Sequence, residues 1–492
     1  MFEAAELGHA IDKPTYLSEL QALREGLLKA QYDLKENATF PVIVVIAGLA
    51  GAGKSETVHQ LNEWMDPRLN ETQAFDEPTD EERERPRLWR YWKVLPEKGR
   101  IGLFFGAWYD EPIDGHFSGR LDHTEVDALV AENVRFEQLQ VHEGALLLKF
   151  WFHLSEDEQR KRLKKLRKSR LTRWRVTAEE RSHLRHYRRL TRGAERVLRG
   201  SNTGEAPWLL VEGVDERYRN LTVGRALLEA LRARLDHAGP LHVIETPPLP
   251  SPVDRLEVLD KLDLSLQMSE PKYERELLAW QGRLNLAMRA AQFKKKHALV
   301  AVFEGNDAAG KGGAIRRVTS ALDPRLYDIM SVAAPTDEER ARPYLWRFWR
   351  KLPRRGELTI FDRSWYGRVL VERVEGLSPE SDWLRAYSEI ADFESQLVAH
   401  GVIVVKFWLA ISKDEQLRRF HEREEVPWKQ FKITPEDYRN REKWGAYSAA
   451  VNDMVERTST ELAPWTLVEA EDKRYARIKV LKTLAQAVER VL

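Results

Sequence analysis

Two glycine-rich segments of the sequence are of a type that binds phosphate. Gly48 to Ser55, GLAGAGKS, matches the pattern G-x-x-x-x-G-K-[ST], and Gly305 to Gly313, GNDAAGKGG, keeps the same spacing up to Lys311. Glycines let backbone N–H groups close around phosphate oxygens at a helix N-terminus, and the lysine adds a positive charge. We therefore expect chemistry on phosphate groups.

Carboxylates distinguish the two segments. Phosphoryl transfer needs Mg²⁺ to neutralise charge, and an acid must hold the metal. Asp307 lies inside the second loop and Asp362 closes the apolar run LTIFD, so we expect both to be metal ligands. The first segment lacks these groups. In place of Asp307, Asp362, Arg363 and Ser364, the aligned positions hold Ala50, Phe105, Gly106 and Ala107.

The second loop departs from the standard pattern at one position. Gly312 stands where a Ser or Thr hydroxyl would normally reach the metal, and we expect Asp307 to take over that task. The loop positions expected to contact phosphate alongside Lys311 are Gly305, Asn306, Ala308, Ala309, Gly310, Gly312 and Gly313.

The elements that position these residues belong to an internal repeat. PTDEERERPRLWRYWKVLP, beginning at Pro78, returns at Pro335 as PTDEERARPYLWRFWRKLP, 257 positions later, and two further blocks keep this spacing. These blocks begin at Lys149 and Lys406, and at Pro207 and Pro464. The Pro-rich stretch between the copies favours extended structure. We expect a degenerate N-terminal domain over 1–240, a linker over 241–256 and a catalytic domain over 257–492.

Each copy alternates short apolar runs with amphipathic helical stretches. The runs that begin at Pro41, His297, Leu358, Gly401 and Pro464 are apolar nearly throughout, which suits strands covered on both faces. The pattern predicts an α/β fold of two tandem P-loop kinase-like domains. Each would be a doubly wound parallel sheet with helices on both faces and a helical lid.

Composition narrows the class of protein. With 79 Lys+Arg against 78 Asp+Glu, anion binding must come from local patches. There is no cysteine, which excludes disulfides, thiolate metal sites and cysteine nucleophiles. No apolar run approaches the roughly 20 residues that span a bilayer. We expect a cytoplasmic protein that does not bind membranes.

The combination of GNDAAGKGG, FDRSWYGR and a later EKWxxY stretch resembles the polyphosphate kinase 2 family, and two fused copies resemble its two-domain members. The resemblance covers nearly the whole chain. It implies Mg²⁺-dependent transfer of the terminal phosphoryl group of inorganic polyphosphate to AMP, giving ADP. It also implies functional roles for Asp307, Lys311, Asp362 and Arg363. The first copy keeps only Lys54 of these four, which argues for one active centre.

Basic residues after the second copy's KFWLAISKDEQ block are placed to act as a lid. A helix that begins near Leu417 is interrupted at Pro427 and restarts near Thr434, which predicts a helical hairpin over the phosphate site. The cations that could point at phosphates are Arg418, Arg419, Arg423, Lys429, Lys432 and Arg439. The alternative is that they are solvated charges paired with neighbouring glutamates.

The first copy has a denser basic tract, RKRLKKLRKSRLTRWR, from Arg160. Such a tract could guide a polyphosphate chain, form a solvated face or bind nucleic acid, and we favour the first over the last. In the second copy, Trp346 and Trp349 could stack on adenine, although their spacing favours packing. Arg368 is a candidate for the acceptor's α-phosphate.

Several alternatives stay open. The acceptor could be ADP, or the donor could be ATP as in a nucleoside monophosphate kinase, because a phosphate loop does not distinguish what the phosphates belong to. A polyanion- or nucleotide-binding regulator without turnover is disfavoured by the two retained acids. We expect polyphosphate and AMP as partners, with no nucleic acid. The fused pair would form an intramolecular pseudo-dimer, and further association of chains is left open.

Overall fold

The computed structural model describes residues 1–237, 258–428, 430–433 and 435–492. Packing divides the chain into two compact units. The first comprises Met1–Pro78, Arg90–Leu241 and Thr336–Pro343, and the second comprises Thr79–Trp89, His242–Pro335 and Tyr344–Leu492. The predicted linker, 241–256, lies outside the described residues. No described helix is long and apolar enough to cross a membrane.

The two copies of the repeat form the same succession of elements. In the first copy the strands are β1 Val42–Gly48, β2 Asn70–Ala74, β3 Ile101–Phe105, β4 Leu146–His153 and β5 Trp208–Glu212. Its helices are α1 Lys13–Asn37, α2 Lys54–Trp64, α3 Asp80–Arg83, α4 Trp89–Trp92, α5 Asp110–Ser118, α6 His123–His142, α7 Glu156–Lys168, α8 Ala178–Arg185, α9 Tyr187–Gly200 and α10 Glu216–Asp236, with 3-10 turns η1 Phe2–Ala5 and η2 Arg173–Arg175.

The second copy repeats this order. Its strands are β6 Ala298–Gly305, β7 Tyr327–Ser331, β8 Leu358–Asp362, β9 Val402–Ala410 and β10 Trp465–Glu469. Its helices are α11 Glu270–Arg289, α12 Ala291–Lys296, α13 Lys311–Thr319, α14 Asp337–Arg340, α15 Trp346–Trp349, α16 Val371–Val374, α17 Glu380–Ala399, α18 Lys413–Glu425, α19 Pro435–Glu442, α20 Trp444–Thr458 and α21 Lys473–Glu489, with 3-10 turns η3 Val258–Lys261, η4 Pro324–Leu326, η5 Trp365–Arg368 and η6 Gln430–Lys432.

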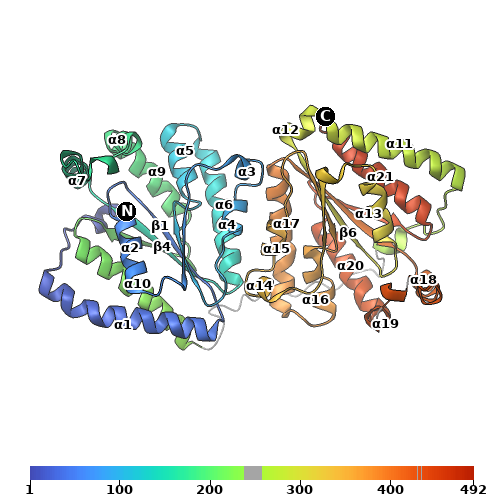
Figure 1. Cartoon of the computed structure of the whole chain (residues 1–492), viewed down its shortest axis with the longest axis horizontal. Coiled ribbons are helices and arrows are strands. Elements are labelled where there is room, and N and C mark those ends of the chain that lie inside the picture. The colour runs from blue at the N-terminus through green and yellow to red at the C-terminus, as the bar shows by residue number, and fades with distance from the viewer. Residues whose placement is uncertain (238–257, 429, 434) are drawn as a thin grey trace. The chain divides into compact units, whose positions relative to one another are not determined.

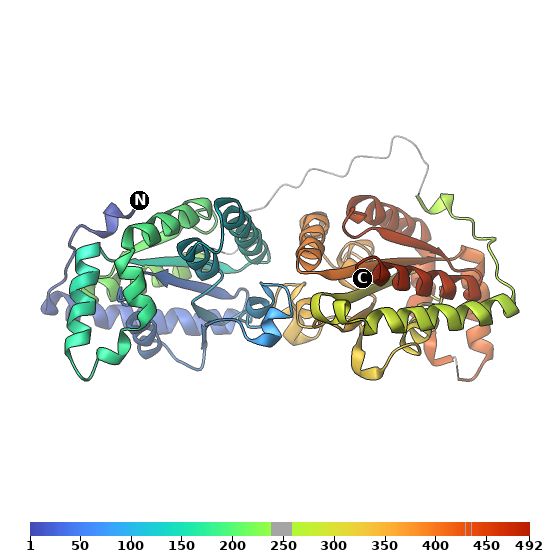
Figure 2. The ribbon, with the colours of Figure 1, turned by 90° about the horizontal axis from the view of Figure 1, so that it is seen from above.

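Both sheets are parallel and have the same strand order. The first is β2-β3-β1-β4-β5 and the second, listed from its other edge, is β10-β9-β6-β8-β7. Helices cover both faces of each sheet (Figures 1 and 2). This confirms the predicted doubly wound α/β fold. Because β6 is central and parallel to β8 and β9, the loop that follows β6 lies beside the carboxyl ends of both neighbours.

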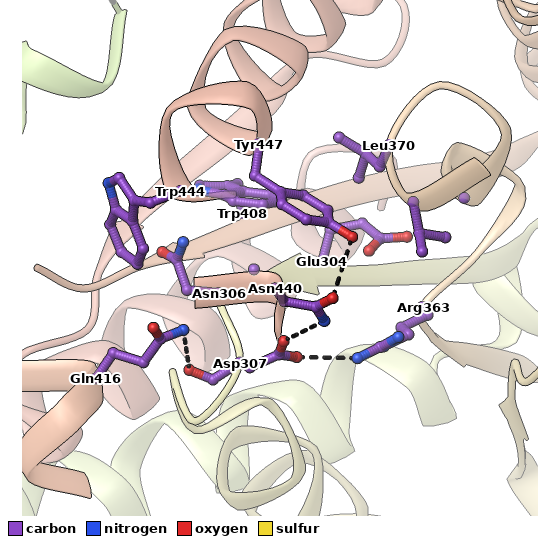
Figure 3. Close-up of a pocket in the computed structure, with 13 residues that line it drawn as sticks. Glu304, Asn306, Asp307, Arg363, Leu370, Trp408, Gln416, Asn440, Trp444 and Tyr447 are labelled. Atoms are coloured by element: carbon purple, nitrogen blue, oxygen red, sulfur yellow. Dashed lines mark hydrogen bonds and ion pairs between the residues drawn. The ribbon is translucent and has the colours of Figure 1, made fainter. Parts of the chain in front are cut away.

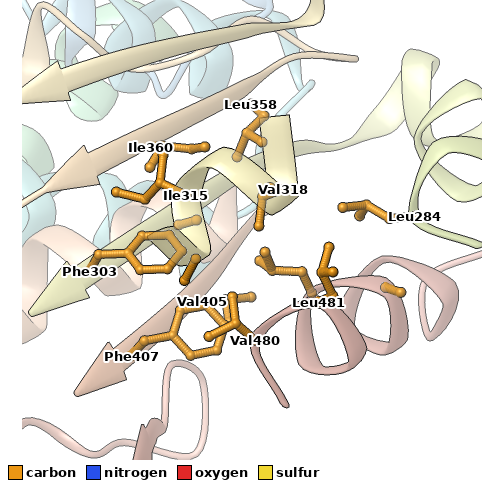
Figure 4. Packing of buried hydrophobic residues seen from close by; sticks show 14 of the residues in the cluster. Leu284, Phe303, Ile315, Val318, Leu358, Ile360, Val405, Phe407, Val480 and Leu481 are labelled. Carbon is orange, nitrogen blue, oxygen red and sulfur yellow. The ribbon is translucent and has the colours of Figure 1, made fainter. Parts of the chain in front are cut away.

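The core of the second copy fixes the strand that carries the loop. Phe303 of β6 and Phe407 of β9 are fully buried with ring centroids 5.1 Å apart. They pack beneath α13 and α21, where Val318 and Leu481 are also fully buried (Figure 4). Each such side chain contributes roughly 1.5–3 kcal/mol through burial, so β6 and the start of α13 have little freedom to move.

The aromatic block at Leu345 to Trp349 packs inside the second copy. Trp346 is 2% exposed and Trp349 is 1% exposed, and Trp349 meets the edge of the Phe393 ring at 5.1 Å. Packing, rather than stacking on adenine, is therefore the role of these two residues.

Candidate phosphoryl-transfer site

The loop of the second copy joins β6 to α13 in the geometry of a phosphate cradle. Gly305 has a φ of 149°, and a Cβ there would lie 2.5 Å from the Leu409 carbonyl oxygen, so only glycine fits. Gly310 precedes α13 without a side-chain cap, which leaves the first N–H groups of the helix available to an anion. The Lys311 ammonium donates to the Gly305 carbonyl at 2.7 Å. Burial lowers the pKa of Lys311, and the negative charge of Asp307 acts in the opposite direction without cancelling this effect.

Asp307 is held by two side chains from distant segments. Arg363 donates to one carboxylate oxygen at 2.9 Å, and Asn440 of α19 donates to the other at 2.9 Å (Figure 3). Tyr447 lies 3.5 Å from the Asn440 side-chain oxygen. Burial works against the Arg363 charge, but the carboxylates of Asp307, Glu304 and Asp362 raise its pKa above the ordinary value. The loop residue Asp307 and the residue that follows the β8 strand end, Arg363, are therefore in direct contact.

Asp362 ends β8 directly beside β6. It pairs in register with Phe303, two residues before the loop begins, and its charge acts on both Lys311 and Arg363. Both Ala308 and Arg363 adopt left-handed backbone, with φ of 64° and 63°. For residues with a Cβ this conformation is strained, and strain of this kind is common at functional sites.

Glu304 belongs to the site although the sequence analysis did not single it out. It is 5% exposed and accepts a hydrogen bond from the Ser364 hydroxyl at 2.8 Å. Burial raises its pKa. The repeat positions in the first copy hold Ala47 and Ala107, so both partners are absent there. Comparing the copies at this position would have identified the pair.

A cavity opens beside the loop, between the end of β6, the residues after β8 and helices α19 and α20. The loop and Arg363 supply its polar side, while Trp408, Trp444 and Tyr447 supply aromatic faces (Figure 3). The lining residues are Glu304, Gly305, Asn306, Asp307, Arg363, Gly367, Leu370, Val371, Trp408, Gln416, Asn440, Trp444 and Tyr447. Phosphate groups and a flat apolar group could both be accommodated.

The remaining predicted loop residues lie around the same cradle. Asn306 accepts from the Ile411 N–H at 3.2 Å, and Ala308 and Ala309 are buried beneath the loop. Gly312 and Gly313 belong to the first turn of α13. Gly312 supplies no hydroxyl, and Asp307 is the nearest acid in the sequence of the loop.

The predicted lid consists of α18, η6 and α19, and its basic residues differ in placement. Arg418 is exposed and paired with Glu415 at 2.7 Å, and Arg439 is exposed and paired with Glu436 at 3.3 Å. Arg423 is half-buried on α18. Lys429 and Thr434 lie outside the described residues, as does the side chain of Lys432.

Arg419 and Arg368 lie outside the cavity wall. Arg419 is 2% exposed and donates to the Ala308 carbonyl at 3.0 Å and to the Ala470 carbonyl at 2.8 Å, so it supports the loop from behind. Arg368 is paired with Glu372 at 2.9 Å and lies over the Tyr344 ring.

The first copy keeps the loop but not the cluster. Lys54 donates to the Gly48 carbonyl at 2.6 Å, as Lys311 does to Gly305. Gly51 and Gly106, the counterparts of Ala308 and Arg363, have φ of 74° and 68°, so the backbone is the same without the strain. Phe2 stacks on Trp151, the counterpart of the cavity residue Trp408, with ring centroids 5.8 Å apart.

Comparison with known proteins decides the family. The model of the polyphosphate kinase 2 family matches residues 10–238 and again residues 267–491. The chain belongs to the polyphosphate kinase 2 family. It is 56% identical to a polyphosphate:AMP phosphotransferase of Pseudomonas aeruginosa, over 99% of both chains. It is 39% identical to one of Acinetobacter johnsonii, over 95% of this chain and 96% of the other.

A solved structure supports the same assignment. A crystal structure of a Pseudomonas aeruginosa PA01 protein described as a polyphosphate kinase 2 superposes with a TM-score of 0.89 at 54% identity. The match covers 100% of this chain and 99% of the other. Both copies of the repeat are therefore polyphosphate kinase 2 domains in sequence and in fold.

Proposed function

We propose that this polyphosphate kinase 2 transfers the terminal phosphoryl group of inorganic polyphosphate to AMP, giving ADP, at the site in its second copy. The observation that carries the proposal is the meeting of Lys311, Asp307 and Arg363 at the phosphate loop, where Asp307 and Arg363 also line the cavity. The two full-length relatives are named polyphosphate:AMP phosphotransferases, which supports this donor and this acceptor.

In this proposal the loop holds the end of the polyphosphate chain. N–H groups at the start of α13 and the Lys311 ammonium face the phosphoryl group, and Arg363 approaches from the end of β8. Positive groups fixed before the reaction stabilise the charge that spreads over the equatorial oxygens. The adenosine of AMP lies against the aromatic side of the cavity, near Trp408 and Trp444.

The reaction needs little proton transfer. An oxygen of the AMP phosphate attacks the terminal phosphorus of the chain, a new P–O bond forms, and the bond to the bridging oxygen breaks. The products are ADP and a chain shorter by one phosphate. The attacking oxygen is already anionic, so Asp307 or Asp362 need only orient it. Catalysis rests on position and charge.

Mg²⁺ fits the residues present. No group of three or more Asp, Glu or His side chains among the described residues could enclose a metal, but Mg²⁺ is commonly held by one or two carboxylates together with substrate phosphates. Asp307 and Asp362 are the two that would hold it. When bound, the ion supplies neutralising charge on the oxygens of the phosphates.

The predicted lid cations complete the proposal. Arg418, Arg423, Arg439, Lys429 and Lys432 are proposed to face the phosphates once substrate is bound, while Arg419 keeps the loop in shape. Arg368 is proposed to meet the acceptor's α-phosphate, which requires that it exchange its present partner, Glu372.

The test is ADP formation from AMP, Mg²⁺ and purified polyphosphate without ATP. The matched pair of variants is Lys311→Ala and Lys54→Ala, because the two lysines make the same contact in the two copies. We expect Lys54→Ala to retain most of the wild-type rate. Lys311→Ala should lose it by about 10²-fold or more, as for other groups that stabilise developing charge.

The controls separate the alternatives. Replacing AMP with ADP tests the acceptor, and replacing polyphosphate with ATP tests the donor. Asp362→Asn should abolish turnover while leaving AMP binding, measured by calorimetry, in place. Equal loss in Lys54→Ala and Lys311→Ala would contradict a single active site in the second copy.

A further inference from the structure

The loop of the first copy is more strongly cationic than its counterpart. Lys54 is retained, and Arg162 lies beside the loop with its guanidinium 3.4 Å from the Gly213 carbonyl. The acids of the second copy's site are replaced by Ala47, Ala50 and Phe105. Gly53 precedes α2, a helix of 11 residues, without a side-chain cap. The positive end of α2 therefore adjoins a loop without acids, and the one acid in the first turn of α2, Glu56, is paired with Arg162 at 3.8 Å.

Arg219 adds a buried positive charge at this loop. It comes from α10, is fully buried, and lies so close to the loop that a Cβ at Gly53 would be 2.0 Å from its Nη1. Its Nε donates to Thr57 of α2 at 3.0 Å. Its Nη2 finds no hydrogen-bond partner, and no carboxylate lies within ion-pair distance, among the residues that the structure describes.

In the second copy, the guanidinium behind the loop has a carboxylate partner. Arg419 supports that loop from behind, and its Nε is paired with Glu415 at 2.5 Å. Its other nitrogens reach backbone carbonyls of Ala308, Ala470 and Glu471. The repeat position of Arg219 holds Ala476 there. The first copy also has an acid here that the second lacks, Glu56 at the repeat position of Gly313, but its ion pair is with Arg162 at 3.8 Å. Arg219 itself is in no ion pair among the described residues, and burying a charge is costly unless a counter-charge accompanies it.

The basic tract predicted from the sequence begins next to this loop. Gln159 of α7 donates to the Ala50 carbonyl at 3.0 Å, which ties the helix to the loop. Arg160 and Lys161 are paired with acids of the same helix. Arg162 is half-buried and paired with Glu56. The four cations after Leu163 are exposed and form no ion pair among the described residues: Lys164, Lys165, Arg167 and Lys168.

We propose that the first copy is a second binding site for condensed phosphate, one that needs no metal and transfers nothing. The loop, with Lys54 and Arg219, takes a terminal phosphoryl group, and Lys164, Lys165, Arg167 and Lys168 hold the phosphates that follow. A condensed phosphate chain matches this arrangement because it carries charge at every unit and offers no bases to recognise. The inference rests on the proposed function only in taking polyphosphate as the donor.

The test is calorimetric titration of the full-length chain with tripolyphosphate in EDTA. The Lys311→Ala background weakens the second site, so that the remaining binding reports on the first copy. We expect about one equivalent to bind, and we expect Lys54→Ala in this background to weaken binding by about tenfold or more, as for loss of a charge-assisted contact. The control is Lys29→Glu, which reverses an exposed charge on α1, and it should leave binding unchanged.

A second variant tests the helix. Replacing Lys164, Lys165, Arg167 and Lys168 with glutamate should weaken the binding of long-chain polyphosphate more than the binding of tripolyphosphate. The affinity of the variant should also depend less on salt concentration. Equal binding with and without Lys54 would overturn the proposal, as would orthophosphate binding as tightly as tripolyphosphate. Tighter binding of single-stranded oligodeoxythymidylate than of polyphosphate would replace it with a nucleic-acid site. Absence of ADP formation by the wild-type chain, with binding at the first copy intact, would count against the proposed function alone.

Discussion

At the scale of single residues, the repeat provides matched pairs for measuring strain. Ala308 and Arg363 hold left-handed backbone in the second copy, where Gly51 and Gly106 hold it in the first. A side chain in this conformation places its Cβ close to neighbouring backbone, at a cost of roughly 1 kcal/mol. The second copy retains that cost at two residues that flank the Asp307 cluster.

Ala308→Gly should therefore raise the free energy of unfolding, by about 1 kcal/mol less the greater entropy of glycine in the unfolded chain. Gly51→Ala should lower it by a similar amount. The nearest atom to a Cβ at Gly51 is 3.5 Å away, on Leu163, so its cost is conformational rather than steric. Urea unfolding of both variants checks the pair, and a stabilising Gly51→Ala would contradict the assignment of strain.

At the scale of elements, α18 is tied to the phosphate loop through one carboxylate. Glu415 accepts from Arg418 at 2.7 Å and from Arg419, which in turn supports Ala308. The hydrogen bond from Arg418, with the charge of Arg419, lowers the pKa of Glu415 to about 2. A carboxyl group with a depressed pKa contributes stability that is present above its ordinary pKa, near 4.5, and lost as pH falls toward 2.

Glu415→Gln should therefore reduce the melting temperature at pH 6. The gap between wild type and variant should narrow as the pH falls from 5 toward 2. In this range the Glu415 carboxyl group of the unfolded chain takes up a proton while that of the folded chain, with its pKa of about 2, is still largely ionised. Thermal unfolding followed by circular dichroism at each pH measures the gap. Asp414→Asn, on the neighbouring position of the same helix, serves as the control. A gap that stays constant with pH would show that the carboxylate charge is not responsible.

Much of the second copy could be predicted from the order of residue types. Apolar runs followed by glycine located β6 and its loop, and alignment of the copies located Asp307, Asp362 and Arg363. Asn440 was missed because its contact with Asp307 joins positions 133 residues apart, which no local pattern reports. Glu304 was missed because it sits inside an apolar run and reads as the end of a strand. Arg419 was predicted as a phosphate ligand from its charge, whereas its burial behind the loop depends on packing.

At the scale of the whole molecule, both copies are built around the same buried ion pair. Lys406 of β9 and Glu394 of α17 lie 2.7 Å apart with almost no exposure, and Lys149 and Glu137 repeat this in the first copy at 2.7 Å. Lys406 also donates to the Thr458 carbonyl at 2.7 Å. Because the pair persists in the copy that has lost the acids of the site, its role is to hold strand and helix together.

Glu394→Ala should lower the free energy of unfolding by about 3–5 kcal/mol, because it leaves a buried ammonium group without its counter-charge. Adding Lys406→Met should recover part of that loss, since no unpaired charge then remains. Chemical denaturation of the single and double variants measures the coupling. Glu137→Ala provides the matched change in the first copy and should leave the Michaelis constant for AMP unchanged. Strict additivity of the two substitutions would contradict the account.

Gly51 and Gly106 make it unfavourable for the first copy to acquire the side chains that the second copy has at these two positions. Because Gly51 and Gly106 occupy the left-handed positions, the backbone there is relaxed, and replacing them with the side chains of the second copy meets a penalty before any activity is gained. At Gly106 the penalty is also steric, because a Cβ there would lie 2.6 Å from the Phe75 carbonyl oxygen. Acids placed at positions 50 and 105 would still lack the arginine that holds Asp307 in the second copy, because position 106 cannot take a side chain until the Phe75 carbonyl moves. Under the proposed function, single substitutions would therefore not convert the first copy into a second transfer site.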